Sequence, residues 1–338
     1  MTLDRRTFVA GSLALGATAL HPLAQAAGTV LKISHQFPGG TLTEGDFRDR
    51  MCRRFAADIE KKTNGALTAQ VYPNSSLMKT NAQFSAIRKG ALDMSLVPLS
   101  YAGGEVAETN IGLLPALVPS YEIGSKWKTA DVGKLLTQIL AEKGIIIVTW
   151  IWQAGGVASR TKAVVTPDDA KGMKIRGGSR EMDMMFKDAG ASVLSLPSNE
   201  IYAAMQTGAM DAALTSSTSL ISFRLEEVAK ALTSGRGKSY WFMFEPLMIS
   251  KEVFGKLTKP QQDAIMSVGA DLEKFAVDSA KADDVAVAEV YAKKGSKVVD
   301  LDDATLAKWQ VLAKPVWQDY AGKNENCAKL LAAAQKLL

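Results

Sequence analysis

Histidine and cysteine are scarce in this chain of 338 residues, which contains two of each. His21 and His35 cannot build a histidine-rich zinc site, and Cys52 and Cys327 lie too far apart in sequence to form a Cys-x-x-Cys pair. A disulfide between the two cysteines remains open, but Cys52 lies in an amphipathic helical pattern that favours a buried thiol. We therefore expect neither a metal site nor a cofactor.

Sequence motifs of the common enzyme classes are also missing. Residues 235–239 (GRGKS) resemble part of a phosphate-binding loop, but Leu232 stands where the first glycine is required. No G-x-S-x-G segment occurs, no G-x-G-x-x-G follows a strand, and a serine–histidine–acid triad in the exported chain could use only His35. We therefore expect a protein that is not an enzyme.

Charge of one sign is not concentrated anywhere in the chain. The 40 Lys+Arg and 35 Asp+Glu are interspersed, without a basic block or an aromatic-interleaved basic stripe. This pattern argues against nucleic acid as a partner, whereas the mild positive excess is compatible with a small anionic ligand. After residue 26, no segment approaches the roughly 18 consecutive apolar residues of a membrane span.

The first 26 residues are predicted to be an export signal. Arg5 and Arg6 form a charged start, residues 8–20 are an apolar run of mostly small side chains, and residues 24–26 (AQA) fit a cleavage site. The Arg-Arg-x-Phe order is similar to the twin-arginine signal, with an ordinary export signal as the alternative. We expect cleavage near Ala26.

Segments with strand and helix patterns alternate through the rest of the chain. Residues 30–35, 67–73 and 93–99 have strand patterns, and residues 45–63 show apolar side chains at helical spacing before Asn64 and Gly65. This alternation predicts an α/β fold with a largely parallel sheet. The apolar run of residues 144–152 (GIIIVTWIW) predicts a buried central strand, and the chain after Leu247 is predicted to be mostly helical.

One short pattern occurs twice. Residues 86–98 (AIRKGALDMSLVP) and 204–216 (AMQTGAMDAALTS) share A-x-x-x-G-A-x-D followed by a strand pattern. Each copy predicts a helix that ends at a glycine in the left-handed conformation and then turns into a strand. This device is common in α/β proteins and proves no duplication, but one copy in each half fits two similar α/β lobes.

Arg176 ends a short apolar run and is followed by two glycines. Glycines provide no side-chain cover, so the guanidinium could face a cavity. The alternative is an ordinary ion pair with a surface carboxylate.

Residues 166–179 (TPDDAKGMKIRGGS) and 188–212 (DAGASVLSLPSNEIYAAMQTGAMDA) resemble the signature region of the DctP-type substrate-binding proteins of tripartite ATP-independent periplasmic (TRAP) transporters. Residues 60–77 and 86–94 match as well, so the resemblance spans nearly all of the mature chain. It implies a periplasmic-binding-protein fold, in which two α/β lobes enclose a ligand cleft and long helices cross between the lobes. We expect residues 27–152 and 242–281 in the first lobe, and residues 153–241 and 282–338 in the second.

The resemblance also implies a function. Such a protein is a monomeric periplasmic receptor that captures a small carboxylate and delivers it to a small and a large membrane subunit. Transport is driven by an ion gradient, which agrees with the missing nucleotide motif. A receptor that presents its ligand to a membrane sensor is not distinguished from this by the sequence.

In this family, the arginine that matches Arg176 makes a two-pronged salt bridge to the ligand carboxylate, a geometry that suits a guanidinium. This sequence departs from many relatives, because Thr215 stands where they carry a ligand-contacting asparagine, and residues 153–159 lack a second arginine. The full set of predicted ligand contacts is Arg176, Trp152, Thr215, Ser216, Tyr101, Gln36, His35, Pro98, Gly178 and Phe242. A structural role for His35 and a core position for Trp152 remain alternatives.

A single arginine can neutralise one carboxylate but offers few partners to the hydroxyls of an acid sugar. Val97, Leu99 and Trp152 are apolar side chains that could cover a ligand tail. The sequence therefore favours a monocarboxylate with an apolar or aromatic tail, such as a 2-oxo or 2-hydroxy acid. A C4-dicarboxylate receptor is one alternative, and an exported carboxylate-processing enzyme is another.

Overall fold

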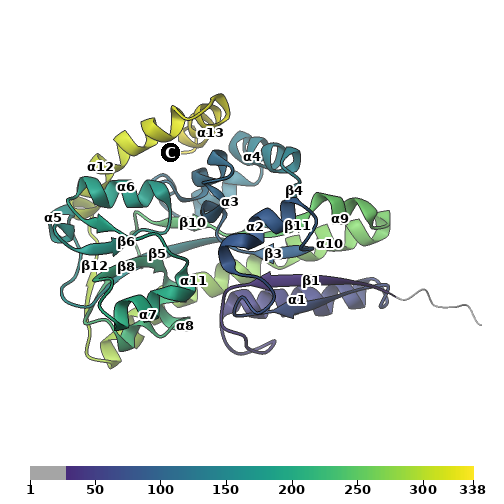
Figure 1. The fold of residues 1–338 in the computed structure, drawn as a ribbon, viewed down its shortest axis with the longest axis horizontal. Coiled ribbons are helices and arrows are strands. Elements are labelled where there is room, and N and C mark those ends of the chain that lie inside the picture. Colours follow the sequence, from purple (N-terminus) through teal and green to yellow (C-terminus); the bar gives the residue numbers. More distant parts are fainter. Residues whose placement is uncertain (1–27) are drawn as a thin grey trace, which may run out of the picture.

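Two β-sheets with helices packed on them form the two halves of the molecule (Figure 1). The computed structural model of the protein describes residues 28–338, so the predicted export signal and its cleavage near Ala26 lie outside the described residues. Within that range, no helix combines the length and the apolar character needed to cross a membrane. The two-lobed α/β architecture predicted from the sequence is confirmed.

The first sheet has five strands, with the parallel strands at one side. Their order is β2 (Leu67–Tyr72), β1 (Thr29–His35), β3 (Met94–Leu96), β11 (Leu247–Ser250) and β4 (Ile145–Thr149). β1 is parallel to β2 and β3, whereas β11 is antiparallel to β3 and β4. The helices of this half are α1 (Phe47–Lys62), α2 (Thr80–Arg88), α3 (Tyr121–Trp127), α4 (Asp131–Glu142), α9 (Lys251–Lys256) and α10 (Lys259–Asp271).

The second sheet has seven strands. Six follow the order β12 (Lys297–Asp300), β9 (Ala231–Ser234), β5 (Trp152–Ser159), β8 (Ala212–Ser216), β6 (Lys174–Arg176) and β7 (Ser192–Val193), and β10 (Phe242–Phe244) pairs with β5. Strands β5 and β8 are antiparallel, and β6 is parallel to both β7 and β8. The helices of this half are α5 (Pro167–Ala170), α6 (Arg180–Asp188), α7 (Ile201–Gln206) and α8 (Ser217–Ser222).

The chain passes between the halves through two short strand crossovers. Trp150 and Ile151 join β4 to β5, and Glu245 and Pro246 join β10 to β11. The long helix α11 (Glu273–Lys293) contacts α1 in the first half and α8, β5 and β9 in the second.

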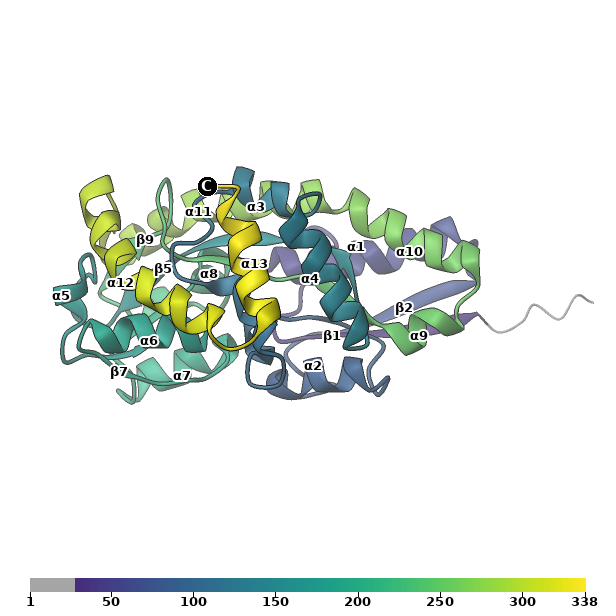
Figure 2. The same cartoon turned by 90° about the horizontal axis from the view of Figure 1, so that it is seen from above.

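Near the C-terminus, α12 (Asp303–Ala321) packs on α6, and α13 (Glu325–Gln335) packs beside α4 (Figure 2). The crossing helices predicted from the resemblance are therefore present. The residue boundaries of the two lobes stay a prediction.

Two expectations about the strands were wrong. Both sheets are mixed rather than largely parallel, because the strands that enter and leave the crossovers run antiparallel to their neighbours. Residues 144–152 do not form one central strand, since β4 ends at Thr149 and β5 begins at Trp152 in the other sheet. β4 lies at the edge of its sheet, and α4 and α10 pack against it, which explains why its sequence is apolar throughout.

The repeated helix–glycine–strand pattern is confirmed. Gly90 has φ +68° between α2 and β3, and Gly208 has φ +78° between α7 and β8, so one copy serves each sheet. Both cysteines are buried free thiols. Cys52 packs among the side chains of α1 and the first sheet, whereas Cys327 packs in a separate cluster with Leu330 and Tyr320.

Gly155 allows a close approach in the middle of the second sheet. A Cβ at this position would lie 2.4 Å from the carbonyl oxygen of Thr215 and 2.4 Å from Cε3 of Trp241. Thr215 lies near the end of β8, which pairs with β5. The close spacing of these two strands therefore requires that residue 155 has no side chain.

We predict that Gly155→Ala destabilises the protein by about 1–3 kcal/mol, because the added methyl group must displace the backbone of β8. Gly255→Ala is the matched control: its added methyl group would have no heavy atom within 4 Å, so it should stabilise helix α9 by about 0.5–1 kcal/mol. Urea unfolding of both variants measures the difference. Equal stability of Gly155→Ala and the native protein would contradict the close approach.

Candidate functional site

Carboxyl ends of parallel strands from the two sheets face each other across the junction of the halves. The segments that follow β1 and β3 contact the segments that follow β6 and β7. The amide of Gln36 donates to Oγ of Ser198 at 2.8 Å, and the guanidinium of Arg176 donates to the hydroxyl of Tyr101 at 2.7 Å. Such an edge is where α/β proteins place their ligands.

Arg176 lies at the end of β6 with 2% of its surface exposed. Three of its donors have protein partners, since Nε donates to the carbonyl of Leu196 at 3.0 Å and Nη1 to the carbonyl of Leu214 at 2.8 Å, while Nη2 donates to Tyr101. These contacts hold the guanidinium plane in one orientation. A guanidinium carries five N–H groups, so one on Nη1 and one on Nη2 remain available.

No ion pair of residues 28–338 includes Arg176. The surface ion pair that was the alternative for this residue is therefore not formed within the described chain. A buried cation without a counter-charge is costly, and an anion that reaches it is bound strongly. The arrangement is suited to binding one carboxylate.

Tyr101 adds a second donor beside the arginine. It belongs to the short helix η1 (Leu99–Ala102), which follows β3, and the carbonyl of Pro98 at the start of η1 accepts a bond from its backbone N–H at 3.1 Å. The hydroxyl oxygen accepts from Arg176 and also from the backbone N–H of Ser198 at 3.0 Å. Because both bonds use the oxygen as acceptor, the hydroxyl hydrogen is free to donate to an anion.

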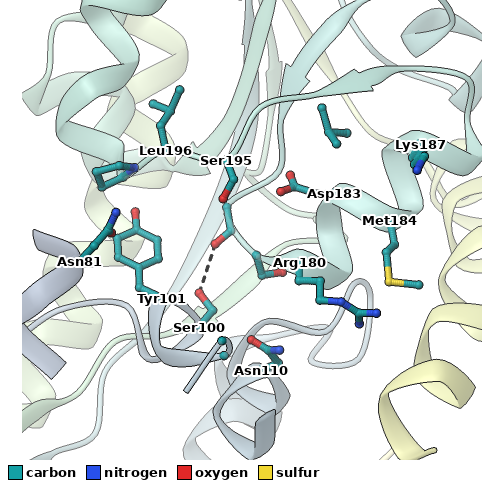
Figure 3. A pocket seen from close by; sticks show the side chains of 16 residues that line it. Asn81, Ser100, Tyr101, Asn110, Arg180, Asp183, Met184, Lys187, Ser195 and Leu196 are labelled. Atoms are coloured by element: carbon teal, nitrogen blue, oxygen red, sulfur yellow. Dashed lines mark hydrogen bonds between the residues drawn. The ribbon is translucent and has the colours of Figure 1, made fainter. Parts of the chain in front are cut away.

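A cavity of about 620 Å³ opens between the halves next to this pair (Figure 3). Its walls come from α2, η1 and η2 (Ala107–Leu113) on one side and from α6, β7 and the segment after β7 on the other. Tyr101, Gly178 and Leu196 line the cavity, and Arg176 contacts both Tyr101 and Leu196. The arginine therefore lies directly behind the cavity wall.

Gly178 makes room for the arginine itself. It has φ +95°, and a Cβ there would lie 2.6 Å from Nη1 of Arg176. Its carbonyl accepts from the hydroxyl of Ser100 at 3.2 Å, which links the two halves (Figure 3). The close approach of a ligand to this glycine stays a prediction.

His35 is fully buried, and both ring nitrogens have protein partners. Nδ1 accepts from the backbone N–H of Phe37 at 3.2 Å, so Nε2 is the donor to Oδ1 of Asp49 at 3.1 Å. Burial of Asp49 favours a higher pKa, but hydrogen bonds from His35 and Arg53 outweigh it and the pKa is lowered. The contacts of His35 thus shape the end of β1. Its neighbour Gln36 has a buried Oε1 without a partner among the described residues.

Thr215 and Ser216 end β8, next to the Leu214 carbonyl that binds Arg176. The hydroxyl of Ser216 caps α8 by accepting from the backbone N–H of Ser219 at 3.1 Å. Thr215, which lies between Leu214 and Ser216, is buried with 2% of its surface exposed. The structure therefore brings Arg176, Tyr101, Gln36, Pro98, Gly178, Thr215 and Ser216 to one junction.

Trp152 and Phe242 are not part of that group. The Trp152 ring packs edge-on to Trp127 at a centroid distance of 4.9 Å and against Phe244 at 5.2 Å, in the core cluster that also contains Val97 and Leu99. Phe242 packs in the same cluster, edge-on to Tyr121. These are core contacts, and a ligand role for either aromatic side chain stays a prediction.

A second buried arginine at this junction was not predicted from the sequence. Arg48, which is fully buried, binds Asp46 and Glu245 and also donates to Ser216 and Ser219. One signal could have indicated it. Glu245 is the only charged residue of the apolar run from Tyr240 to Ser250, and a carboxylate in such a run requires a partner.

Two halves linked by crossovers, with a buried arginine between them that makes no ion pair within residues 28–338, define a two-lobed ligand-binding protein. The DctP family, described as bacterial extracellular solute-binding protein, family 7, matches residues 39–324. The chain belongs to this family, which confirms the resemblance seen in the sequence. The members of this family take part in solute transport and are not enzymes.

Individual relatives agree with this assignment. A solute-binding protein of Albidiferax ferrireducens is 69% identical over 317 residues, which cover 94% of each chain. A crystal structure of a TRAP periplasmic solute-binding protein from Rhodoferax ferrireducens with bound malonate is 70% identical, has a TM-score of 0.90, and covers 91% of this chain and 98% of its own. The C4-dicarboxylate-binding periplasmic protein DctP of Rhodobacter capsulatus is 26% identical over 314 residues, 92% of this chain and 90% of its own.

Asp183 of α6 allows a test of the electrostatics beside Arg176. Burial raises the pKa of its carboxyl to about 6, although the N–H of Gly177, which donates to Oδ1 at 2.8 Å, and the charge of Arg176 both lower it. An acid whose pKa is higher in the folded than in the unfolded state loses stability as the pH rises between the two values, here from about 4 to about 6.

Asparagine keeps the acceptor oxygen but cannot ionise. We therefore predict that the stability advantage of Asp183→Asn over the native protein grows by about 2 kcal/mol between pH 4.5 and pH 7.5. Urea unfolding at the two pH values measures this change. If the difference in unfolding free energy between the two proteins does not vary with pH, burial does not raise the pKa of the Asp183 carboxyl.

Proposed function

We propose that the protein is a periplasmic receptor of a TRAP transporter and that it binds a small organic carboxylate at Arg176 for delivery to the membrane subunits. The observation that carries this proposal is the buried guanidinium of Arg176, which has no carboxylate partner in residues 28–338 and keeps two N–H groups free. A carboxylate would accept both N–H groups at once, the geometry that makes arginine specific for this anion.

Tyr101 supports the same role. Its free hydroxyl hydrogen lies beside the free N–H groups of Arg176, so one carboxylate can accept from both side chains. Tyr101 comes from the first half and Arg176 from the second. A ligand that touches both halves is bound more tightly in the closed than in the open arrangement, and it therefore favours closure.

The rest of the site favours a compact polar ligand over one with an aromatic tail. Val97, Leu99 and Trp152, which were expected to cover such a tail, pack in the core instead. Oε1 of Gln36, which lies at this junction, is buried and has no partner among residues 28–338. An amide can present either its oxygen or its N–H₂ group, so Gln36 can serve as an acceptor or a donor.

The relative that is 70% identical holds malonate, a short dicarboxylate. Together with the buried Oε1 of Gln36, this supports a short dicarboxylate or a similarly compact acid with a second oxygenated group. A carboxylate with an aromatic or branched apolar tail, the ligand favoured by the sequence alone, is the second candidate.

We predict that Arg176→Ala weakens malonate binding by about 30- to 1000-fold, equal to about 2–4 kcal/mol. Arg176→Lys should also lose much of the affinity, because an ammonium group cannot make the two-pronged contact. Isothermal titration calorimetry measures both effects.

Arg236→Ala is the matched control, since Arg236 already has a two-pronged partner in Asp300 at the surface, with N···O distances of 2.9 Å. It should bind malonate within threefold of the native protein. Binding by Arg176→Ala within threefold of the native protein would overturn the assignment of Arg176.

A thermal-shift panel tests the ligand class. We expect short dicarboxylates to raise the melting temperature more than aromatic 2-oxo acids or hexuronates do, because Val97, Leu99 and Trp152, which were expected to cover an apolar tail, pack in the core. Stabilisation by aromatic 2-oxo acids, with no effect of malonate or succinate, would restore the apolar-tail hypothesis.

A further inference from the structure

A buried polar cluster, which we call the Arg48 cluster, joins both halves and both crossovers. Asp46 and Arg48 stand at the start of α1 in the first half, and Ser216 and Ser219 stand at the start of α8 in the second. Glu245 lies in the crossover between β10 and β11, and Gln153 lies on β5 just after the other crossover. All six side chains are buried in the structure.

Arg48 holds the cluster together. Its Nε and Nη2 donate to the two carboxylate oxygens of Asp46 at 2.9 and 2.6 Å, and its Nη1 lies 3.3 Å from Oε2 of Glu245. Both Nη atoms lie 3.1 Å from the hydroxyl of Ser219 in the other half. The guanidinium carbon also lies 3.6 Å from the centroid of the Phe37 ring.

The charges of the cluster do not balance when both acids are ionised, because two carboxylates share one guanidinium. The amide of Gln153 donates to Oε2 of Glu245, whereas Oε1 of Glu245 is buried without a partner in the part of the chain that the structure describes. Burial raises the pKa of Glu245 to about 7, and the Asp46 carboxylate adds to this, although Arg48 and Gln153 act in the opposite direction.

Opening of the two halves at the crossovers would separate Arg48 from Ser219 and admit water to Glu245. We propose that Arg48 and Glu245 are positioning residues for ligand binding, which form a clamp only when the halves are closed and take up one proton at Glu245 on closing. The effect of this clamp on ligand affinity rests on the proposed function, because it requires that ligand binding closes the halves.

Other titratable groups lie near the Arg48 cluster. The charged groups that act on the Glu245 carboxyl are Arg48 and Asp46. Cys52 of α1 is a buried thiol whose pKa is raised by burial and by nearby carboxylates that include Asp49, Asp46 and Glu245, so it stays neutral. Asp283 of α11 interacts with Asp46 and Arg48 and accepts from Oγ1 of Thr218 at 2.7 Å.

The direction of the pH effect follows from the raised pKa. Once the halves open, hydrated Glu245 returns toward its ordinary pKa near 4.5. Between that value and about 7, the open state has lost its proton and the closed state keeps it, so closing becomes less favourable as the pH rises. Because one proton is taken up, the equilibrium constant for closing falls by up to about tenfold per pH unit, and the fall levels off above about pH 7.

Glu245→Gln tests the proton, because glutamine keeps the shape and the acceptor oxygen but stays neutral. Calorimetry measures the malonate dissociation constant of both proteins from pH 5 to pH 8, and the protonation of malonate itself cancels in their ratio. We expect the two affinities to lie within about fivefold of each other at pH 5, and the ratio of the native dissociation constant to that of Glu245→Gln to be at least about tenfold larger at pH 7.5 than at pH 5. A ratio that does not vary with pH would overturn the proposal.

Glu108→Gln is the matched control, since Glu108 is a buried glutamate of η2 whose Oε1 has Asn324 and Asn326 as partners and which is not part of the Arg48 cluster. The ratio of its dissociation constant to that of the native protein should not vary with pH. Hydrogen exchange of the ligand-free proteins gives a second readout that needs no ligand. We expect protection of the amides of α8 to fall with rising pH in the native protein relative to Glu245→Gln. If protection of the α8 amides varies with pH in the same way in both proteins, the proposed clamp is wrong.

The two readouts separate this proposal from the proposed function. If malonate does not bind the native protein, the proposed ligand is wrong. The hydrogen-exchange profiles would still test whether the Arg48 cluster acts as the proposed clamp. Arg176→Ala should leave the pH dependence of those ligand-free profiles unchanged, because none of the hydrogen bonds of Arg176 involves Arg48 or Glu245.

Discussion

The burial of the Arg176 cation without an ion-pair partner among residues 28–338 is the constraint on which the arrangement of this protein depends. The guanidinium is buried at the end of β6, where two carbonyl groups and one tyrosine hydroxyl fix its orientation. These neutral partners satisfy three donors but do not neutralise the charge. An anion that supplies the missing counter-charge therefore gains more from this site than from water, provided that both halves surround it. The free hydroxyl hydrogen of Tyr101 places a donor of the other half beside the same anion.

The rest of the fold positions these groups and allows them to separate. Only two strand crossovers and a few helices connect the halves, so small backbone changes near Ile151 and Glu245 can move one half relative to the other. Crossing helices such as α11 contact both halves and limit the directions of that movement. Behind the ligand junction, the Arg48 cluster adds a second set of contacts between the halves. The proposed ligand anchor and the proposed clamp would thus respond to the same motion from different positions.

Much of this architecture could be predicted from the sequence, because local patterns determine it. Apolar spacing indicated α1, and left-handed glycines at Gly90 and Gly208 ended the helices before β3 and β8. The position of Arg176 before two glycines indicated a guanidinium that faces a cavity, and its role as ligand anchor stays a prediction. The run of residues 144–152 was misread, because an apolar sequence does not show where a strand leaves one sheet for another. Arg48 and Glu245 were missed because they are 197 residues apart and meet only in the folded chain.

The central claim is that one ligand carboxylate supplies the counter-charge of Arg176 between the two halves. A crystal structure of the protein grown with malonate tests this most directly. The account predicts one carboxylate within about 3 Å of both Nη atoms of Arg176, with the hydroxyl of Tyr101 donating to the same group. Malonate bound elsewhere, with Arg176 still contacting only Leu196, Leu214 and Tyr101, would contradict it.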